Sequence, residues 1–449
     1  MNFLRIPTDP AAIIRAAACP LPGARHYDRI LSWLGDGSIV LLGESTHGTH
    51  DFYAARATLT RRLIEEREFS AVAIEGDWPD AYRVNRYVQS GEAGAGDPRE
   101  ALRGVARFPT WMWRNTAVVE FVAWLHEHNA AVAAPAQRAG FYGLDLYSLH
   151  ASVRAVIDYL EKTDPAAARG AREAYACFDH FGDDTDLYGW TAAREGGRSC
   201  EEAVTQQLVA LRERRTDLLR TDGLAAADEF FCAEQNARLA KNAEHYYRTM
   251  FHGRVESWNV RDSHMAETLD ELLAHLRRRG QPPKVVVWAH NSHVGDARAT
   301  ELGAMGELNL GQLARERHGS AARLVGFTTY AGTVIAASDW GGRAELKRVR
   351  PALPGSYEDL FHETGVSRFF LPLTKGGPAR DVVTTRRIER AIGVIYRPET
   401  ERHSHYFDAC LAEQFDAVVH FDETRGVLPL ERDSEWDEVE APETFPSGI

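Results

Sequence analysis

The chain has 449 residues, which is long enough to bury a large hydrophobic core and to form two or three domains. Acidic residues outnumber basic residues by 65 to 52, so the formal net charge is −13. This balance argues against nucleic acid or an anionic membrane as the main partner, because both bind basic surfaces. No run of about 18 apolar residues occurs in the sequence, so we expect no membrane-spanning helix.

The N-terminus and the cysteines bear on the cellular compartment. Residues 1–20 lack the basic segment and the long apolar stretch of a secretory signal. Five cysteines are scattered along the chain without CxxC spacing: Cys19, Cys177, Cys200, Cys232 and Cys410. Their odd number and their spacing favour a reducing compartment over a disulfide framework or a thiolate zinc site. The sequence therefore predicts a cytoplasmic protein.

The first predicted strand ends in a cluster of polar residues. Residues 38–42 are a short apolar run, which is typical of a strand buried on both faces of a parallel sheet. The polar stretch 43–48 follows directly, and residues 51–69 then show the apolar spacing of a helix. Ligands of open α/β sheets bind at the carboxyl ends of the strands. We therefore expect Glu44 and His47 to face a cleft.

Three further predicted strands, at residues 69–74, 139–144 and 284–289, end in the same way. The polar residues that follow them are Glu75 and Asp77 after the first, Asp145 after the second, and His290 and His293 after the third. Because the carboxyl ends of parallel strands meet at one edge of a sheet, we expect these side chains to surround a single cleft. Shorter strands are predicted at residues 324–328, 333–337, 393–396 and 415–421.

Between these two groups of strands the chain changes character. Long helical patterns replace the strand signals, at residues 153–160, 166–178, 201–219, 225–248 and 257–276. We expect an α/β fold with a mostly parallel central sheet flanked by helices, and a large helical insertion that acts as a cap or lid. The predicted division is residues 1–149 and 281–425 for the two parts of the α/β catalytic core, 150–280 for the helical insertion, and 426–449 for an acidic C-terminal tail.

His47 with Glu44 and Glu75 fits a general base that carboxylates orient. A neutral imidazole can take a proton from water at physiological pH, and a hydrogen-bonded carboxylate fixes its tautomer and raises its basicity. In the alternative interpretation Glu44 caps the following helix and His47 binds a backbone carbonyl. A second strand ends in acidic residues, and a second strand ends in histidines. This favours the interpretation of His47 as a general base.

Two other chemistries fit the same residues less well. Residues 43–47 resemble a nucleophile elbow with Ser45 as the nucleophile, but that motif requires glycine at its fifth position, where this chain has His47. The candidate ligands for zinc or iron are His47, His50, His290, His293, Glu44 and Glu75. No HExxH motif is present, and we expect neither a metal nor another cofactor.

With these motifs assembled, the chain resembles the erythromycin esterase-like family. The resemblance rests on residues 42–48, 55–57, 75–81, 143–145, 261–265, 288–293 and 326–330, and it extends over residues 35–425. It implies an α/β core with a helical insertion and a metal-independent hydrolase that opens macrolide lactones with activated water, the chemistry of the antibiotic-resistance enzymes. Residues 78–81 and 111–115 are closer to the environmental branch, many of whose members carry a succinoglycan-biosynthesis label.

The resemblance also implies roles for single residues. His47 matches the general base of the family. The surrounding constellation that orients water and stabilises charge is matched by Glu44, Glu75, Arg56 and His290. Arg56 or His290 would then stabilise the oxyanion. For substrate binding we predict Arg261, His293, Asp145, Trp111 and Tyr147.

The sequence thus predicts a carboxylic ester hydrolase. Its expected partner is a small-molecule ester or lactone, with macrolides as one candidate, and it acts as a monomer or a homo-oligomer. Two alternatives stay open at this point. One is a divalent-metal-dependent hydrolase that uses the same histidines and glutamates, and the other is a non-catalytic or biosynthetic protein that binds a polysaccharide or its precursor.

Overall fold

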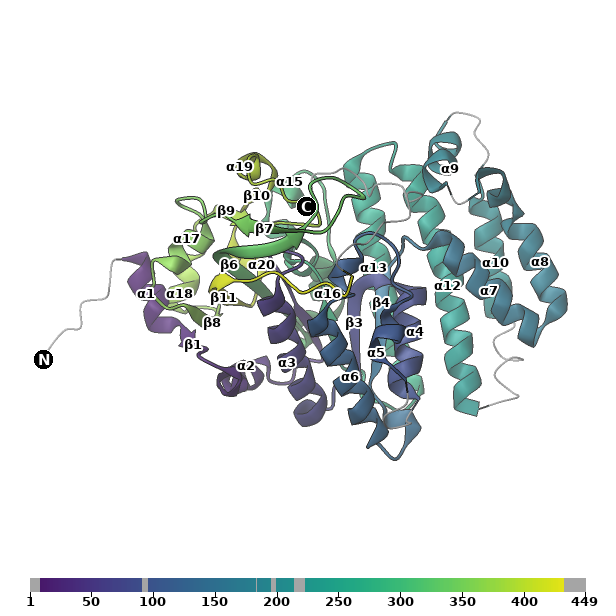
Figure 1. Ribbon diagram of the computed structural model, residues 1–449, viewed down its shortest axis with the longest axis horizontal. Coiled ribbons are helices and arrows are strands. Elements are labelled where there is room, and N and C mark those ends of the chain that lie inside the picture. Colours follow the sequence, from purple (N-terminus) through teal and green to yellow (C-terminus); the bar gives the residue numbers. More distant parts are fainter. Residues whose placement is uncertain (1–8, 91–95, 183, 195–198, 214–222, 432–449) are drawn as a thin grey trace, which may run out of the picture.

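A nine-stranded, mostly parallel sheet runs through the centre of the molecule, with helices on both of its faces (Figure 1). The computed structural model describes residues 9–90, 96–182, 184–194, 199–213 and 223–431, and all counts below refer to these ranges. The strand order is β1-β8-β11-β6-β2-β5-β3-β4, and β7 pairs with β6. All pairs from β11 to β4 in this order are parallel, whereas β1, β7 and β8 pair antiparallel. The predicted fold class is confirmed.

The strands are short, and most of them lie where the sequence shows apolar runs. The sheet consists of β1 (Cys19–Pro20), β2 (Ile39–Leu42), β3 (Ala71–Asp77), β4 (Gly140–Asp145), β5 (Val285–Trp288), β6 (Ala322–Ala336), β7 (Glu345–Val349), β8 (Arg368–Pro372) and β11 (Ala417–Thr424). A separate antiparallel pair consists of β9 (Arg387–Arg390) and β10 (Tyr406–Ala409). Every residue of β2 and β5 is buried, because helices cover both faces of the sheet.

The helices connect the strands and form one large insertion. They are α1 (Pro10–Ala17), α2 (Asp28–Leu34), α3 (His50–Arg67), α4 (Trp78–Gln89), α5 (Pro98–Leu102), α6 (Thr116–Ala130), α7 (Leu149–Thr163), α8 (Pro165–Tyr175), α9 (Thr185–Ala192), α10 (Glu201–Glu213), α12 (Gly223–Thr249), α13 (Arg254–Arg278), α14 (Asn291–Val294), α15 (Glu301–Ala304), α16 (Leu310–His318), α17 (Tyr357–His362), α18 (Pro378–Val382), α19 (Glu401–Ser404) and α20 (Leu411–Gln414). Within the described ranges, none of these helices has the length and hydrophobicity needed to cross a membrane.

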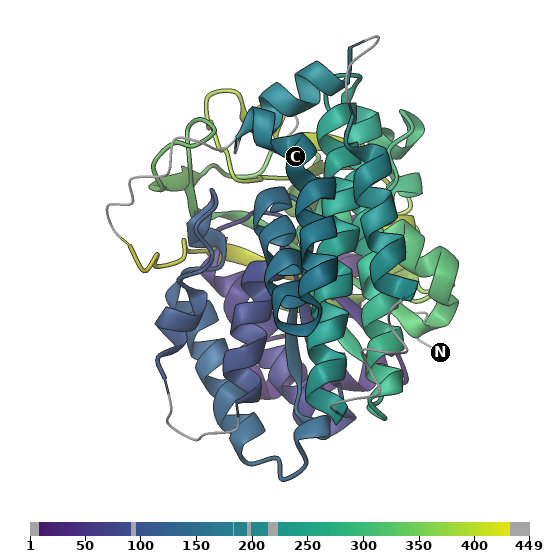
Figure 2. The ribbon, with the colours of Figure 1, turned by 90° about the vertical axis from the view of Figure 1, so that its right-hand side faces the viewer.

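Helices α7 to α13 are inserted between β4 and β5. They pack beside the β4 edge of the sheet, where α12 contacts α7 and α10, and α13 contacts both α12 and β4 (Figures 1 and 2). The predicted helical insertion is thus confirmed. Its boundaries at residues 150–280 and its action as a lid stay predictions, as does the division into domains.

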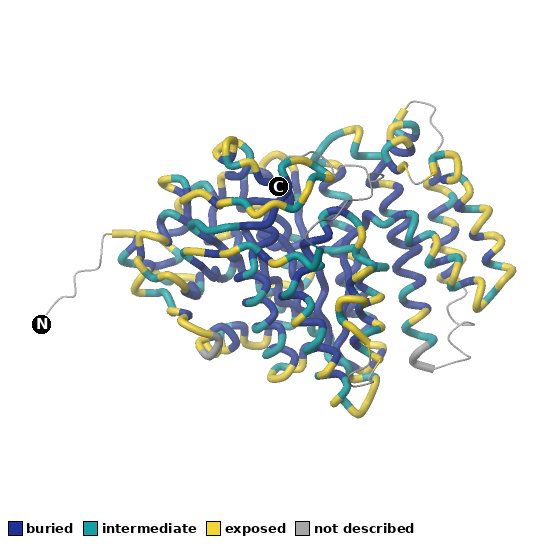
Figure 3. The backbone as a smooth tube through the Cα atoms, viewed as in Figure 1, coloured by how far each residue is buried: buried dark blue, intermediate teal, exposed yellow. Residues whose placement is uncertain are grey.

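Two large hydrophobic clusters form most of the core. Figure 3 shows that the buried residues concentrate in the middle of the molecule. Alternate residues of β2 point to opposite faces, so Ile39 and Leu41 belong to one cluster and Val40 and Leu42 to the other. Because both faces of the strand are covered, its sequence is continuously apolar rather than alternating. This explains why a four-residue run was sufficient to predict the strand.

The structure corrects several local predictions. Residues 324–328 and 333–337 belong to one continuous strand, β6, and residues 393–396 form no strand and contribute only an isolated bridge between Ile395 and Ala337. Of the predicted tail, residues 432–449 lie outside the described residues. The described part, 426–431, packs against the protein, since Val427 is buried and its N–H donates to the Gly48 carbonyl oxygen at 2.9 Å.

The prediction that the cysteines are unpaired is wrong for two of them. Cys177 and Cys200 form a disulfide, with their Cα atoms 5.9 Å apart. They are separated by 23 positions in the sequence, and the chain between them folds back through α9. Spacing in the sequence could not show this contact, because it depends on the packing of the helical insertion.

Two glycines allow the polar loops at the strand ends to approach their neighbours. A Cβ atom on Gly43 would overlap the side-chain oxygen of Asn291. This oxygen accepts the Phe327 backbone N–H, and the amide nitrogen of Asn291 donates to the Phe327 carbonyl oxygen. A Cβ atom on Gly143 would overlap backbone oxygens of β3, where the register shifts between Ile74 and Asp77. This irregularity re-aims the carboxyl end of β3 toward the edge of the sheet.

We predict that Gly43→Ala destabilises the protein by about 1–3 kcal/mol, the usual cost of overpacking, because the Asn291 side chain has to move. Urea unfolding measures this difference in the free energy of unfolding. The control is Gly170→Ala in α8, where no other atom lies near the added methyl group. This change should stabilise the helix by about 0.5–1 kcal/mol. Equal stability of Gly43→Ala and wild type would contradict the close approach.

Candidate active site

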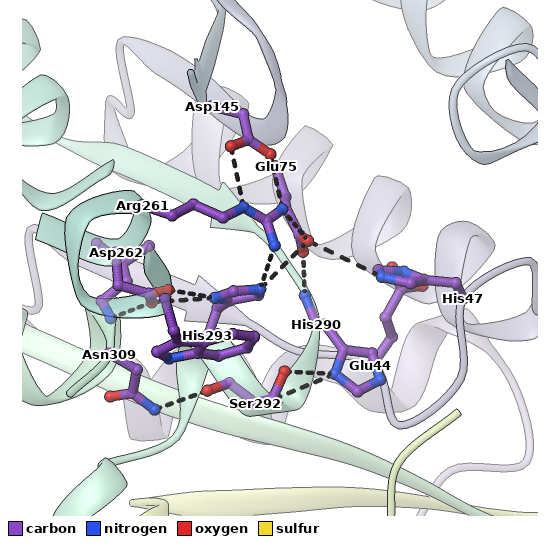
Figure 4. Close-up of polar contacts among 12 residues, drawn as sticks. Glu44, His47, Glu75, Asp145, Arg261, Asp262, His290, Ser292, His293 and Asn309 are labelled. Carbon is purple, nitrogen blue, oxygen red and sulfur yellow. Dashed lines mark hydrogen bonds and ion pairs between the residues drawn. The ribbon is translucent and has the colours of Figure 1, made fainter. Parts of the chain in front are cut away.

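The carboxyl ends of β2, β5, β3 and β4 lie side by side and surround one cavity of about 100 Å³. The cavity wall includes His47 after β2, Glu75 near the end of β3, Asp145 at the end of β4, and His290 and His293 after β5. Figure 4 shows how these side chains point toward one another. All of them are buried. The structure therefore brings together the polar residues that follow four separate strands.

Glu44 links His47 to Arg56. The Nδ1 atom of His47 lies 2.9 Å from Oε1 of Glu44, and Oε2 of Glu44 accepts a hydrogen bond of 2.9 Å from Nη2 of Arg56. Arg56 is fully buried on α3, between the rings of Tyr53 and Trp288. This chain of contacts fixes the Glu44 carboxylate, which in turn fixes the orientation of the His47 ring.

Glu75 is the most connected group of the site. Its Oε1 atom accepts a hydrogen bond of 2.8 Å from Nη2 of Arg261, and it lies 3.4 Å from Nε2 of His293 and 3.9 Å from Nε2 of His47. Its Oε2 atom accepts the backbone N–H of His290 at 2.8 Å. Burial acts to raise the pKa of Glu75, but the charges of His293 and Arg261 hold this pKa well below its ordinary value. Glu75 is therefore a carboxylate at neutral pH.

Arg261, on α13, also binds Asp145. Its Nε atom donates to Oδ1 at 3.0 Å and its Nη2 atom donates to Oδ2 at 2.7 Å. Burial acts to raise the pKa of Asp145, yet Arg261 lowers it below its ordinary value. The guanidinium group thus holds the ends of β3 and β4 together by binding a carboxylate from each.

His293 is held between two carboxylates and a ring. Its Nδ1 atom lies 2.9 Å and 3.0 Å from the two oxygens of Asp262, and its ring stacks on Trp258 with the centroids 4.5 Å apart. Burial acts to lower the pKa of His293, but Asp262 and Glu75 outweigh burial and raise this pKa to about 10. His293 is therefore an imidazolium at neutral pH. Its Nε2 proton points to Glu75, and the 3.2 Å contact between Nε2 and Nη1 of Arg261 joins two cations rather than a donor and an acceptor.

His290 is neutral, in contrast to His293. Burial lowers its pKa well below the ordinary value, against the opposing effects of Glu75 and the Ser45 carbonyl. The backbone N–H of Ser292 donates to Nδ1 of His290 at 3.2 Å. The proton of the neutral ring therefore lies on Nε2. Within the described part of the chain, this Nε2 atom has no hydrogen-bond partner of normal geometry.

The structure separates the predicted site residues into two groups. Those that line the cavity are His47, Glu75, His290, Arg261, His293, Asp145 and Tyr147. Glu44 and Arg56 lie behind His47 and do not line the cavity. Arg56 therefore cannot stabilise an oxyanion directly, although the family resemblance had suggested this role. Trp111 does not line the cavity either. It packs against Gly48, a residue with φ of 68° whose missing Cβ atom makes room for the ring.

Sequence reasoning missed three residues that hold the site in place: Asp262, Ser292 and Asn309. Asp262 is fully buried and accepts the backbone N–H of Leu310 as well as binding His293. Asn309 donates to the Ser292 carbonyl oxygen at 2.7 Å. The adjacency of Asp262 to Arg261 in the sequence was the available signal, because neighbouring helix residues with opposite charges can bind different partners in a buried site.

The alternative of a metal site has little support from the arrangement of the donors. Among the described residues, no group of three or more His, Cys, Asp or Glu side chains is placed to hold a metal ion. His50, one of the proposed ligands, begins α3, and its backbone N–H donates to the Arg425 carbonyl oxygen. His290 and His293 point their Nδ1 atoms at different partners, Ser292 and Asp262.

Comparison with known proteins decides the family. The family model described as erythromycin esterase matches residues 64–424. The chain belongs to this family. The predicted resemblance is therefore confirmed, and membership of the erythromycin esterase family indicates a hydrolase. The match begins after Glu44, His47 and Arg56, so the roles of these three residues depend on the geometry of the site and not on the family match.

Curated relatives of this erythromycin esterase family protein are distant. Erythromycin esterase type II from Escherichia coli is 22% identical over 366 residues, which cover 75% of this chain and 81% of that protein. Putative hydrolase YbfO from Bacillus subtilis is 22% identical over 399 residues, which cover 85% of this chain and 82% of that protein.

Solved structures of similar proteins share the fold. A Bacillus cereus protein matches with a TM-score of 0.78 and 20% identity, covering 94% of this chain and 98% of its own. A succinoglycan biosynthesis protein matches with a TM-score of 0.72 and 22% identity, covering 93% and 97%. An erythromycin esterase mutant in its open conformation matches with a TM-score of 0.62 and 18% identity, covering 93% and 96%. At these identities the likeness establishes the fold alone.

The raised pKa of His293 predicts a pH dependence of stability. A histidine whose pKa rises on folding stabilises the folded state below its unfolded pKa of 6.5, and this contribution is lost as the pH rises toward about 10. We therefore expect the difference in the free energy of unfolding between wild type and His293→Gln to shrink from pH 6.5 to pH 10. Urea unfolding at several pH values measures it, and the imidazole ¹⁵N shifts of wild type follow the same titration. A difference in the free energy of unfolding that stays constant from pH 6.5 to pH 10 would contradict the raised pKa of His293.

Proposed function

We propose that this protein hydrolyses a carboxylic ester or lactone with a water molecule that His47 activates, without a covalent intermediate. One observation carries the proposal: Nδ1 of His47 is bound to a carboxylate that Arg56 holds in place, while the ring lies in the wall of the cavity. A carboxylate only accepts hydrogen bonds, so Nδ1 of His47 carries the proton and Nε2 keeps a lone pair. This is the arrangement of a general base.

The reaction follows from these positions. Nε2 of His47 takes a proton from water, and the water oxygen attacks the carbonyl carbon of the substrate, which gives a tetrahedral oxyanion. The oxyanion then collapses, the bond to the alkoxy oxygen breaks, and the imidazolium of His47 returns its proton to that oxygen. The products are the carboxylic acid and the alcohol, so one water molecule is consumed.

His290 is the best-placed donor for the oxyanion. It lines the same cavity as His47, and the two ring centroids are 4.8 Å apart. Its low pKa keeps it neutral, and its Nε2–H group is available for a new hydrogen bond. A donor that is fixed in place before the reaction stabilises a developing negative charge without the cost of reorganisation.

Ser45 is an unsuitable nucleophile for the same site. It is fully buried and does not line the cavity. Among the described residues its hydroxyl group has no hydrogen-bond partner, so no base is in position to activate it. These facts support attack by water rather than by serine.

The substrate class stays wider than that of the named relatives. The cavity of about 100 Å³ is small beside the ~300–1,000 Å³ of most drug-sized ligand sites. A macrolide would place most of its ring outside the cavity.

A mass-spectrometric screen of macrolides and simple esters, each with and without a chelator, tests the proposal. Uptake of one water that persists with chelator supports it, loss of activity with chelator indicates a metallohydrolase, and no turnover of any compound indicates a binding role.

We predict that His47→Ala and Glu44→Gln each lower kcat by about 10²–10⁴-fold, because the proton acceptor or its orientation is lost. Ser45→Ala should keep most of the activity. Ester hydrolysis is measured at saturating substrate, and circular dichroism checks that the variants are folded. A folded but inactive Ser45→Ala variant would exclude attack by water.

His290→Ala should lower kcat by about 10²–10³-fold with a small effect on KM, because the hydrogen bond forms only as the oxyanion develops. Steady-state kinetics separates the two constants. His290→Gln, which retains an N–H donor on a flexible side chain, serves as the matched control and should recover part of the loss. An increase in KM with unchanged kcat would assign His290 to ground-state binding instead.

A further inference from the structure

The cavity wall is apolar as well as charged. Besides the polar side chains described above, it includes six apolar residues: Ile74 of β3, Ala81 and Val84 of α4, Leu102 of α5, Met112, and Phe141 of β4. All six are buried and belong to one hydrophobic cluster. Their side chains offer no hydrogen-bond donor, so a group bound there is selected by shape and apolar surface.

We propose that this apolar part of the wall, the hydrocarbon pocket, binds a short, unbranched hydrocarbon group of the substrate next to the ester. The proposal rests on the hydrolysis proposed above, and it narrows the substrate to a small ester or lactone. The pocket belongs to the same cavity as His47 and His290, so a bound chain reaches the catalytic groups without leaving the cleft.

The absence of a side chain at Gly76 keeps the cavity wide next to Glu75. Gly76 lies in the wall between Glu75 and Asp77, and a Cβ atom at this position would lie 3.0 Å from Cδ1 of Ile74 and 3.1 Å from Nε1 of Trp113. Any side chain would therefore narrow the cavity at this point. The Trp113 ring is itself fixed, because its Nε1–H donates to the Glu75 carbonyl oxygen at 3.0 Å.

Charged residues also line this cavity, among them Asp77, Asp80 and Arg107. Asp77 accepts the Ser148 backbone N–H at 3.2 Å and lies 3.5 Å from Nε of Arg107. Arg107 in turn lies over the Tyr147 ring, 4.0 Å from its centroid. Asp77 and Arg107 thus have partners of their own, which leaves the apolar residues to bind a hydrocarbon group.

The volume limits the length of the chain. A cavity of roughly 150 Å³ with apolar walls holds a benzene molecule, and the whole cleft here measures about 100 Å³, part of which the ester itself occupies. The hydrocarbon group is therefore smaller than a benzene ring. Each methylene that is buried on binding should raise kcat/KM about fourfold until the pocket is full.

The test uses two ester series, one with the chain on the acyl side (p-nitrophenyl acetate, butyrate and octanoate) and one with it on the alcohol side (ethyl, butyl and octyl acetate). In the series whose chain enters the hydrocarbon pocket, kcat/KM of wild type should rise from the two-carbon to the four-carbon chain and fall at the eight-carbon chain. Val84→Phe should remove the rise from the two-carbon to the four-carbon chain. Val84→Ala should move the preference to longer chains.

A second readout does not depend on activity. Crystals of wild type pressurised with xenon should bind xenon between Val84, Leu102 and Phe141, and crystals of Val84→Phe should not. The proposal of a hydrocarbon pocket would be overturned if wild type binds no xenon there, or if neither Val84 substitution changes the chain-length preference. If wild type hydrolyses no ester but binds xenon there, the pocket stands and the proposed hydrolysis is wrong.

Discussion

The carboxylate of Glu75 connects the elements of this site more than any other group does. Its two oxygens contact Arg261 and His293 on one side, the backbone N–H of His290 on another, and face Nε2 of His47. These partners come from α13 and from the segments after β2 and β5, so one buried charge connects three parts of the chain that are far apart in the sequence. Removing one partner of such a buried group costs about 3–5 kcal/mol, because the remaining charges lose their compensation.

The position of Glu75 depends in turn on backbone geometry. β3 shifts register against β4 just where Glu75 and Gly76 lie, and Gly143 of β4 has no side chain to oppose this shift. A regular strand would point Glu75 to one face and leave the edge of the sheet without its carboxylate. The placement of the charges therefore follows from two glycines and one irregular strand end, and the hydrogen bonds then hold it.

The sequence predicted the parts of the site that follow strands. Each of those strands is covered on both faces, so its sequence is a continuous apolar run, and the polar residues after it were easy to place. The contribution of α13 was harder to predict, because Arg261 lies 116 positions from its partner Asp145 and nothing in a helical pattern indicates which charge is buried. Trp111 was predicted to bind substrate, and Arg56 was predicted from the family resemblance to stabilise the oxyanion, but both are buried and neither lines the cavity. The Cys177–Cys200 pair was missed for a related reason, since it depends on how the insertion folds.

The balance of charges bears on the chemistry as a whole. The linked groups comprise four carboxylates (Glu44, Glu75, Asp145 and Asp262) and three cations (Arg56, Arg261 and His293). These seven groups hold one negative charge in excess. This excess opposes a second negative charge in the cavity. An anionic substrate is therefore disfavoured, a neutral ester is not, and the oxyanion requires a donor of its own. Neutral His290 meets this requirement because it donates a hydrogen bond without adding a charge to the network.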